Sequence, residues 1–297
     1  MALKPSQLER IHRRYPSKRA AITGAGSGVG AALAKELARH GWTLFLNDID
    51  NDRLRIASEI AQAAGGKVLA AAFDVANLEA YAKPVEDFLI AHGGIDLVFA
   101  CAGIGVGSSF LATKPEHFRE VIDVNLLGTI WTGKAFLPAM VETGRGHFVT
   151  IASAAAFHGL PHLSGYAATK AGVVQLSETL RSELAPLGVD VTVKMTTFYT
   201  SNIAEFTRGA PEEVEKARSL VQMAPWSSAE VADALLLKVQ ARRFYMVAPG
   251  QAKVLWRFKR FLPEMYLRLM PKLFPKLEAK WLAKAAQRQK ADDPNTN

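Results

Sequence analysis

Seven short apolar runs alternate with longer helical patterns between residues 19 and 250, and this alternation restricts the fold more than any other feature. The runs are predicted to be buried strands at residues 20–23, 43–47, 67–72, 97–100, 147–151, 189–195 and 245–247. Between them, apolar residues recur at helical spacing, as in Val29, Leu33 and Leu37. This alternation predicts an α/β fold, a Rossmann-like, doubly wound, seven-stranded parallel sheet with helices on both faces.

Composition divides the chain into a basic arm at 1–18, a dinucleotide-binding and catalytic domain at 19–250, and a basic tail at 251–297. The net charge of +8 is uneven, since residues 1–19 carry +5, the tail carries +7 and the stretch between them carries −4. A DNA-reading domain usually has a basic stripe across its fold. We therefore expect no nucleic-acid partner, and we interpret the two ends as segments that touch anionic surfaces.

Cysteine content and hydropathy indicate the cellular compartment in which the protein is expected to lie. The single cysteine, Cys101, excludes an intramolecular disulfide and favours a reducing environment. The N-terminus lacks the apolar run of a signal peptide, and no stretch of about 18 uncharged apolar residues occurs. We expect a cytoplasmic protein that is peripheral to a membrane.

A glycine-rich turn follows the first predicted strand and opens the first predicted helix. Glycines let a backbone approach a pyrophosphate, whose charge then lies at the positive N-terminus of the helix. The residues expected to hold a dinucleotide here are Gly24, Ser27, Gly28, Val29 and Gly30. An ordinary strand-to-helix turn is the alternative, because a glycine cluster alone is weak evidence.

Acidic residues after the next two strands bear on the choice of dinucleotide. Asp48 can accept hydrogen bonds from the adenosine ribose and repel a 2′-phosphate, and neither Ser27 nor the residues beside Asp48 supply an arginine for that phosphate. We therefore expect NAD rather than NADP. Asp48 as a helix cap is the alternative, although Asp52 is better placed for capping. Asp74 and Val75 are expected to contact the adenine, unless Asp74 is only an exposed turn residue.

Tyr166 and Lys170 are four residues apart, which stacks them on one face of a predicted helix. Tyrosine is a poor base at neutral pH, but a nearby ammonium favours the phenolate, so the pair suits removal of a hydroxyl proton as hydride leaves carbon. A partly exposed helix pair is the alternative. Ser153 follows a strand and can hydrogen-bond the reacting oxygen. Asn125 is an amide in an apolar helix and needs a water or backbone network.

With these motifs in this order, the chain resembles a classical member of the short-chain dehydrogenase/reductase family over about residues 17–250. The resemblance implies that Tyr166 is the acid/base, and that Lys170 lowers the pKa of Tyr166 and binds the nicotinamide ribose. It also implies that Ser153 polarises the substrate oxygen, and that Asn125 holds a water linking Lys170 to solvent.

The sequence departs from the family pattern in two loops. The usual Asn-Asn-Ala-Gly reads Ala-Cys-Ala-Gly at residues 100–103, and the usual Pro-Gly reads Thr-Thr at 196–197. The cofactor contacts that the resemblance places in and after these loops are Ala102, Gly103, Thr197 and Thr200. Ser201 is the alternative to Thr200, and Cys101 is interpreted as a packing residue.

Apolar loops after the fourth, fifth and sixth strands predict a hydrophobic alcohol or ketone as substrate. The expected lining is Ile104, Val106, Phe110, Phe157, Leu160, Leu163, Phe198, Tyr199, Ile203 and Phe206. Residues 200–227 are interpreted as a mobile lid that carries a charged helix. His158 and His162 invite a metal interpretation, but Pro161 between them favours ordinary loop histidines and no metal.

The tail repeats apolar residues every three or four positions, with lysines and arginines between them. Helices of this kind lie in the headgroup layer of an anionic membrane, but helices that pack on a protein body look much the same. Pro263, Pro271 and Pro275 are expected to break the tail into short helices. The aromatic and arginine content favours membrane contact through residues 251–290, and packing on the body or on a partner subunit stays open.

Three functions stay open on the sequence alone. The favoured one is an NAD-dependent oxidoreductase that transfers hydride between the nicotinamide and a lipophilic secondary alcohol or ketone, such as a lipid, steroid, terpene or aromatic. The second is an NADPH-dependent ketoreductase of acyl chains, which Asp48 opposes. The third is a non-catalytic, membrane-associated NAD-binding protein. The resemblance further implies a homodimer or homotetramer through the helices at 115–141 and 164–187.

Overall fold

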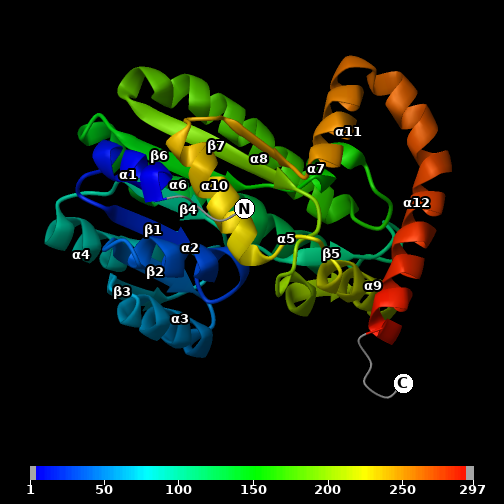
Figure 1. The fold of residues 1–297 in the computed structure, drawn as a ribbon, viewed down its shortest axis with the longest axis horizontal. Helices are drawn as coiled ribbons and strands as arrows, with labels where there is room; N and C mark the ends of the chain where they lie inside the picture. Colours follow the sequence, from blue (N-terminus) through cyan, green and yellow to red (C-terminus); the bar gives the residue numbers. More distant parts are fainter. Residues whose placement is uncertain (1–4, 292–297) are drawn as a thin grey trace.

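Seven parallel strands form the central sheet in the order β3-β2-β1-β4-β6-β7-β9 (Figure 1). The strands are β1 (Arg19–Thr23), β2 (Thr43–Asp48), β3 (Lys67–Ala72), β4 (Leu97–Ala100), β6 (Gly146–Ile151), β7 (Val189–Thr196) and β9 (Tyr245–Ala248). Every predicted strand is confirmed to within one residue, because strands buried under helices on both faces read as short continuous apolar runs. The computed structural model describes residues 5–291, without the side chains of residues 5–9, 277, 278 and 280–291.

Helices cover both faces of the sheet, which confirms the Rossmann-like, doubly wound α/β fold. One core lies beneath α1 (Pro5–Arg14), α2 (Gly28–Ala38), α3 (Asn51–Ala63) and α10 (Ser228–Gln240). The other lies beneath α4 (Ala82–His92), α6 (Gly128–Glu142) and α8 (Ser164–Leu184). The shorter elements are η1 (Glu79–Tyr81), β5 (Gly105–Gly107), α5 (Pro115–Ile122), the π-helical turn η2 (Asp123–Leu127), α7 (Ala155–His158), η3 (Ala185–Leu187), η4 (Ile203–Phe206), β8 (Thr207–Gly209) and α9 (Pro211–Gln222).

The strand order determines where a ligand can bind. From β1 the chain proceeds outward to β2 and β3, and it then returns to place β4 on the other side of β1. The loops that leave β1 and β4 therefore run in opposite directions, and they open a crevice at the carboxyl ends of these strands.

The start of α3 corrects one expectation. Asp50, rather than Asp52 or Asp48, caps this helix, since its side chain accepts hydrogen bonds from the backbone N–H groups of Asp52 and Arg53. The cap precedes the first helical residue, Asn51, so Asp52 is already inside the first turn. Asp48 does not cap the helix, so its carboxylate is available at the crevice.

The N-terminal segment is attached to the body of the molecule. Ile11 and Tyr15 are buried in the core that α2 and α10 share. Arg14 forms an ion pair of 2.8 Å with Asp190 at the start of β7. Residues 1–4 of the predicted arm lie outside the described residues.

The tail forms two helices, α11 (Gly250–Phe261) and α12 (Pro263–Ala291), which stand beside α7 and α9 (Figure 1). Pro263 begins α12 as expected, but Pro271 and Pro275 lie inside a continuous helix, so the predicted further breaks are wrong. Both prolines are exposed, so water can reach the backbone carbonyls that lose their helical partners. Residues 292–297 of the predicted tail lie outside the described residues. Within the described part, no helix has the length and apolar content needed to span a bilayer.

Candidate active site

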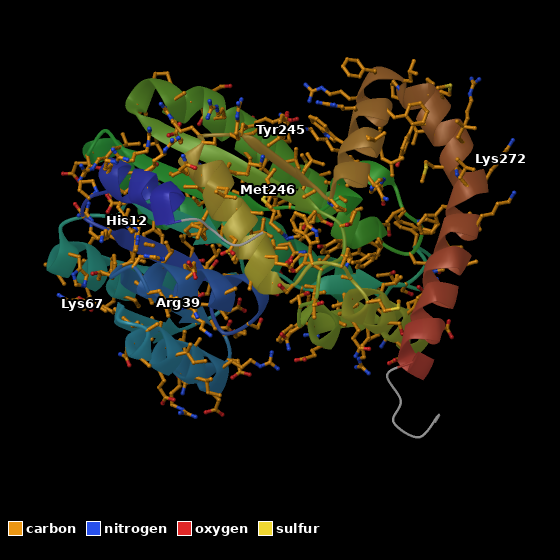
Figure 2. The ribbon with its side chains drawn as sticks, in the orientation of Figure 1. His12, Arg39, Lys67, Tyr245, Met246 and Lys272 are labelled. Carbon is orange, nitrogen blue, oxygen red and sulfur yellow. The ribbon has the colours of Figure 1, made fainter. Side chains whose placement is uncertain are left out.

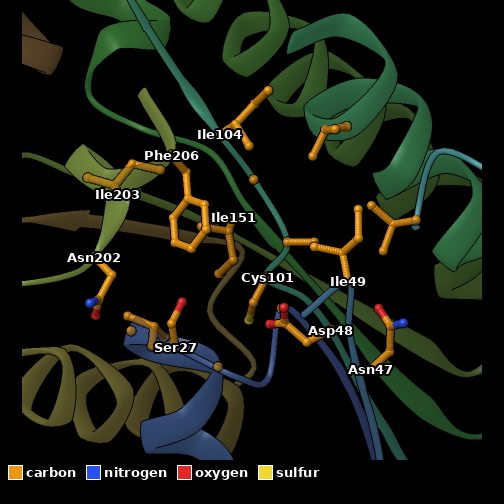
Figure 3. A pocket seen from close by; sticks show the side chains of 18 of the residues that line it. Ser27, Asn47, Asp48, Ile49, Cys101, Ile104, Ile151, Asn202, Ile203 and Phe206 are labelled. Atoms are coloured by element: carbon orange, nitrogen blue, oxygen red, sulfur yellow. The ribbon is translucent and has the colours of Figure 1, made fainter. Parts of the chain in front are cut away.

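A cavity of about 390 Å³ occupies the crevice (Figure 3). It is lined by the following predicted cofactor residues: Gly24, Ser27, Gly28, Val29, Gly30, Asp48, Asp74, Val75, Ala102 and Gly103. They come from the carboxyl ends of β1 to β4, so the sheet topology gathers in one place residues that are far apart in the sequence.

The glycine-rich turn packs too closely for side chains at two of its glycines. A Cβ on Gly24, whose φ is +63°, would lie 2.8 Å from the backbone of Ala102, and a Cβ on Gly30 would overlap the carbonyl oxygen of Gly24. This packing holds the first turn of α2 directly at the cavity. A pyrophosphate placed there would meet unpaired N–H groups and the positive end of the helix dipole.

Asp48 borders the cavity and also braces the turn. Its Oδ2 accepts a hydrogen bond of 2.9 Å from the N–H of Gly26, and its Oδ1 accepts one of 3.1 Å from the N–H of Asp50. Each carboxylate oxygen keeps further acceptor capacity for ribose hydroxyls. The sequence analysis considered Ser27 and the residues beside Asp48, but Arg53 in α3 also comes close, because a Cβ built on Gly26 would meet both Arg53 and Asp48. The first turn of α3 brings Arg53 back to this point.

Asn47 is a lining residue that the sequence analysis missed. Its Nδ2 donates hydrogen bonds to the carbonyl oxygens of Ala71 and Phe73, and its buried Oδ1 has no partner. An unpaired buried acceptor in the cavity wall suits a donor on a ligand. Together with the glycine-rich turn and Asp48, it makes this end of the cavity fit the adenosine half of a dinucleotide.

The predicted catalytic residues meet where β6 and α8 adjoin. Ser153, just beyond β6, lies near the phenol of Tyr166, and Lys170 Nζ lies 5.7 Å from the centre of the Tyr166 ring. The ammonium of Lys170 donates a hydrogen bond of 2.9 Å to the carbonyl oxygen of Ile151. Burial raises the pKa of Tyr166, and the Ser153 hydroxyl opposes that rise. Burial lowers the pKa of Lys170 to about 8.

Asn125 connects the catalytic helix to the loop after β4. Its Oδ1 accepts a hydrogen bond of 2.9 Å from the N–H of Ile104, and its Nδ2 donates to the Ile104 carbonyl at 3.0 Å and to Thr169 Oγ1 at 3.3 Å. The side chain therefore satisfies its polar atoms through protein groups in η2, the loop and α8. A Cβ on Gly103 would lie 3.0 Å from Asn125 Oδ1 and 3.4 Å from Lys170 Nζ.

The loop after β7 differs from expectation. Thr197 and Thr200 are not in the cavity lining, because their N–H groups donate to the carbonyl oxygens of Ala248 and Trp226 and fix the path of the loop. Tyr199 and Ser201 line the cavity instead. Tyr166, Lys170 and Ser153 also stand outside its lining, beyond Ile151 and Tyr199.

Residues 201–209, which we name the strap, contribute to the cavity lining through Ser201, Asn202, Ile203, Phe206 and Arg208. Glu205 forms an ion pair of 3.1 Å with Arg53 of α3, and Arg208 forms one of 3.0 Å with Glu120 of α5. Strands β5 and β8 pair alongside, with Val106 opposite Arg208. The predicted charged helix within 200–227 is present as α9, and the strap before it is tied to both sides of the crevice.

The apolar residues predicted to surround the substrate do not converge on one pocket. Ile104, Tyr199, Ile203 and Phe206 line the main cavity, whereas Phe198 lines a separate small cavity near Trp226. The other predicted residues lie elsewhere because they belong to different structural elements. Val106 is buried in β5, Phe157 is buried in the core, and Phe110 is 68% exposed against Phe118.

Known proteins share these features. The short chain dehydrogenase family model matches residues 18–211. The probable oxidoreductase EphD of Mycobacterium tuberculosis is 33% identical over 274 residues, which cover 89% of this chain and 46% of that protein. This chain thus spans about half the length of that relative. The estradiol 17-beta-dehydrogenase 11 of Pongo abelii is 29% identical over 276 residues, covering 91% of this chain and 86% of that protein.

A solved structure gives the same result. The short-chain dehydrogenase/reductase from Burkholderia phymatum in complex with NAD has a TM-score of 0.78 at 28% identity, and the match covers 84% of this chain and 94% of that one. The fold, the order of the motifs and the family match agree. The chain therefore belongs to the short-chain dehydrogenase/reductase family of oxidoreductases.

Proposed function

We propose that this oxidoreductase is NAD-dependent and transfers hydride between the nicotinamide and a lipophilic secondary alcohol or ketone. The observation that carries the proposal is the meeting of Tyr166, Ser153, Lys170 and Asn125 next to a cavity that fits a dinucleotide. The nicotinamide, when bound, supplies the acceptor or donor of the hydride.

Tyr166 and Ser153 act on the reacting oxygen. Ser153 donates a hydrogen bond to that oxygen and holds it against the Tyr166 phenol, which lies nearby. Tyr166 removes the hydroxyl proton during oxidation and returns it during reduction. Burial alone raises the pKa of Tyr166, so Tyr166 can act as a base only when positive charge near the phenol lowers that pKa again. Lys170 is the first source of such charge.

Lys170 and Asn125 position the reacting groups. One N–H of the Lys170 ammonium is used on the Ile151 carbonyl, which leaves two donors for the nicotinamide ribose. Asn125 is hydrogen-bonded to Ile104 in the loop after β4 and to Thr169, the residue before Lys170. We infer that Asn125 keeps Lys170 and the loop after β4 in fixed positions relative to one another, in addition to any water that it binds.

The adenosine end favours NAD. Asp48 places a carboxylate where a 2′-phosphate would need a cation, and Asp50 lies next to it. Arg53 is the nearby cation: its Nε pairs with Asp50 at 3.3 Å and its Nη2 with Glu205 at 3.1 Å, while its buried Nη1 has no hydrogen-bond partner among the described residues. Similar solved structures include complexes with NAD and with NADPH, so the preference is inferred from these side chains.

The substrate is inferred to be apolar. Ile104, Ile203, Phe206 and Tyr199 line the cavity. The relative named estradiol 17-beta-dehydrogenase 11 is consistent with a steroid-like or lipid-like alcohol. We therefore expect turnover with secondary alcohols on rings or long chains, and little with short hydrophilic ones.

Initial rates with a panel of hydrophobic alcohols, followed by the absorbance of the reduced cofactor, test this function. NAD should support oxidation at least about tenfold better than NADP, and Tyr166→Phe should lower kcat roughly 10²- to 10⁴-fold with little change in cofactor affinity. A strong preference for NADPH with acyl ketones would support the ketoreductase alternative. Cofactor binding without turnover on any alcohol would support the non-catalytic one.

We further propose that α12 contacts an anionic membrane, and three stripes along this helix support it. Tyr266 and Met270 face the body and are buried. Met265, Leu269 and Leu273, four residues apart, form an exposed apolar stripe. The adjacent exposed basic stripe consists of Arg268, Lys272 and Lys276, and Lys272 extends away from the body (Figure 2). Apolar and basic stripes side by side suit the headgroup layer.

Flotation with vesicles tests this contact. The full chain should bind vesicles rich in anionic phospholipid, and binding should fall with added salt and on a zwitterionic membrane. Leu269→Asp should weaken binding, whereas Leu111→Asp should not, because Leu111 is 95% exposed but lies far along the chain, before α5. Equal binding by both variants would refute a contact through α12.

A further inference from the structure

Lys194 is a buried amine in the middle of β7 that the reaction described above does not use. The side chain is 1% exposed. Val193 and Met195 on either side face the core shared with α8 and α11, so Lys194 faces the opposite side of the sheet. Among the residues that the structure describes, no carboxylate forms an ion pair with Lys194. A buried amine without a counter-ion is costly, and an apolar side chain would fill the same space.

The surroundings of Lys194 place it at one end of the cavity. Its Nζ lies 4.2 Å from the centre of the Tyr199 ring, and its amine interacts electrostatically with Cys101 and Lys170. Tyr199, Cys101 and Ile151, which is the partner of Lys194 in the β6·β7 register, all line the cavity, and Figure 3 shows Cys101 and Ile151 there. The wall in front of Lys194 is therefore the wall nearest the catalytic residues.

We propose that Lys194 is a second amine at the nicotinamide end, and that its charge sets the relative affinity of the site for oxidised and reduced nicotinamide. The inference rests on the proposed function, since a nicotinamide that reaches Tyr166 must lie against this part of the cavity wall. The oxidised ring carries a positive charge and the reduced ring carries none. A protonated Lys194 therefore repels the oxidised form only, and a neutral one repels neither.

The groups around Lys194 make its charge change near neutral pH. Burial is the main cause that lowers its pKa to about 7; Cys101 acts in the opposite direction, and the ammonium of Lys170 acts in the same direction as burial. Burial raises the pKa of the Cys101 thiol to about 12, so this neighbour stays neutral. Tyr199 contributes a ring face, which favours the charged amine, and its own pKa is raised.

The direction of the effect follows from these charges. Below about pH 7 Lys194 is protonated, so the oxidised cofactor binds more weakly while the reduced cofactor is unaffected. Above that pH the amine is neutral and the penalty disappears. Binding of the oxidised form consequently releases a proton from Lys194 at neutral pH, and binding of the reduced form does not.

Dissociation constants for the oxidised and reduced cofactor, measured by fluorescence titration and competition on either side of pH 7, test the proposal. In the wild-type chain, the ratio of the oxidised to the reduced constant should rise roughly tenfold as the pH falls, which corresponds to a shift of one pKa unit. Lys194→Met should remove the change centred near pH 7 and leave only the change that Lys170, whose pKa is about 8, produces at higher pH. Lys67→Met, which changes an exposed lysine at the start of β3, should behave as wild type.

A second measurement does not depend on the fold of the variant. Calorimetry of the wild-type chain at about pH 7, in buffers of different ionisation enthalpy, counts the protons released on binding. More protons should be released with the oxidised than with the reduced cofactor. Equal release, or an unchanged pH dependence in Lys194→Met, would overturn the role of Lys194. Absence of binding by either cofactor would instead refute the proposed function itself.

Discussion

The two ends of the crevice are built differently. At the adenosine end, backbone groups form most of the wall, and Gly24, Gly30 and Asp48 fix its shape through short-range contacts. At the nicotinamide end, side chains form the wall, and they come from β6 and the loops after β4 and β7. The first end therefore tolerates little change in shape, whereas the second tolerates repacking and can be adapted to a particular substrate or cofactor state.

A pair of matched glycine variants compares the two ends directly, and Gly30→Ala should have the larger effect. The added Cβ would overlap the carbonyl of Gly24, and backbone cannot move aside without opening the turn. Overpacking of this kind costs about 1–3 kcal/mol, so cofactor affinity should fall up to roughly a hundredfold. Gly250→Ala, where nothing lies within 4 Å of the added Cβ, is the control for thermal unfolding and for cofactor titration. Unchanged affinity in Gly30→Ala would mean that the turn is not the pyrophosphate site.

Gly103→Ala probes the other end. Its Cβ would meet Asn125 Oδ1 at 3.0 Å and Lys170 Nζ at 3.4 Å, and both are side-chain atoms that can give way by a few tenths of an ångström. We expect kcat to fall roughly tenfold through misplacement of Lys170, while the cofactor dissociation constant changes by less than about threefold. If affinity fell as far as in Gly30→Ala, the distinction between a backbone-built end and a side-chain-built end would be wrong.

The same difference explains which parts the sequence could predict. The glycine-rich turn, Asp48 and the Tyr166–Lys170 pair are local patterns, so their spacing alone located them. The Asn125 contacts with Ile104 and the Arg53 contact with Glu205 join residues far apart in the chain, and no local pattern reveals them. Lys194 was counted as part of an apolar strand, because one lysine does not change the character of such a run.

The strap provides a test of intermediate size, because its ion pairs join the two ends of the crevice. Glu205→Gln removes the partner of Arg53, and Glu120→Gln removes the partner of Arg208. In each pair at least one of the two side chains is more than one-third exposed. Exposed ion pairs contribute about 0.2–1 kcal/mol each to stability. Each variant should therefore speed cofactor release by up to roughly fivefold in stopped-flow displacement, and the wild-type rate should rise with salt.

Glu116→Gln is the matched control for the strap, since Glu116 belongs to α5 like Glu120 but, among the residues with described side chains, pairs with Lys114 alone, at 4.0 Å. It should leave the release rate unchanged. Release that is fast in the wild type and insensitive to Glu205 and Glu120 would mean that the strap does not restrain the cofactor, and that the crevice is open to solvent at both ends.

The effect with the least influence on cofactor binding concerns the link between the tail and the nicotinamide end. Tyr266 of α12 is fully buried and shares a hydrogen bond of 2.7 Å with His158 Nδ1, five residues after Ser153. Tyr266→Phe removes one buried hydrogen bond, so the free energy of unfolding should fall by about 1 kcal/mol. Hydrogen exchange should accelerate in α7 and α12 but not in α2, because the adenosine end has no contact with this pair. Exchange that accelerates equally in α2 would show that the two ends are not independent.

The same contact predicts a pH dependence of fixed sign. Burial lowers the pKa of His158 to about 4, whereas an unfolded histidine titrates near 6.5. The unfolded state therefore binds more protons between these values, so the stability from this site is complete above about pH 6.5 and is lost as the pH falls toward 4. His147 is also buried and neutral and titrates lower still, so the wild type is compared with His158→Gln. The variant should lose less stability across this interval, and an identical slope would mean that His158 is not the group that loosens α7 and the tail in acid.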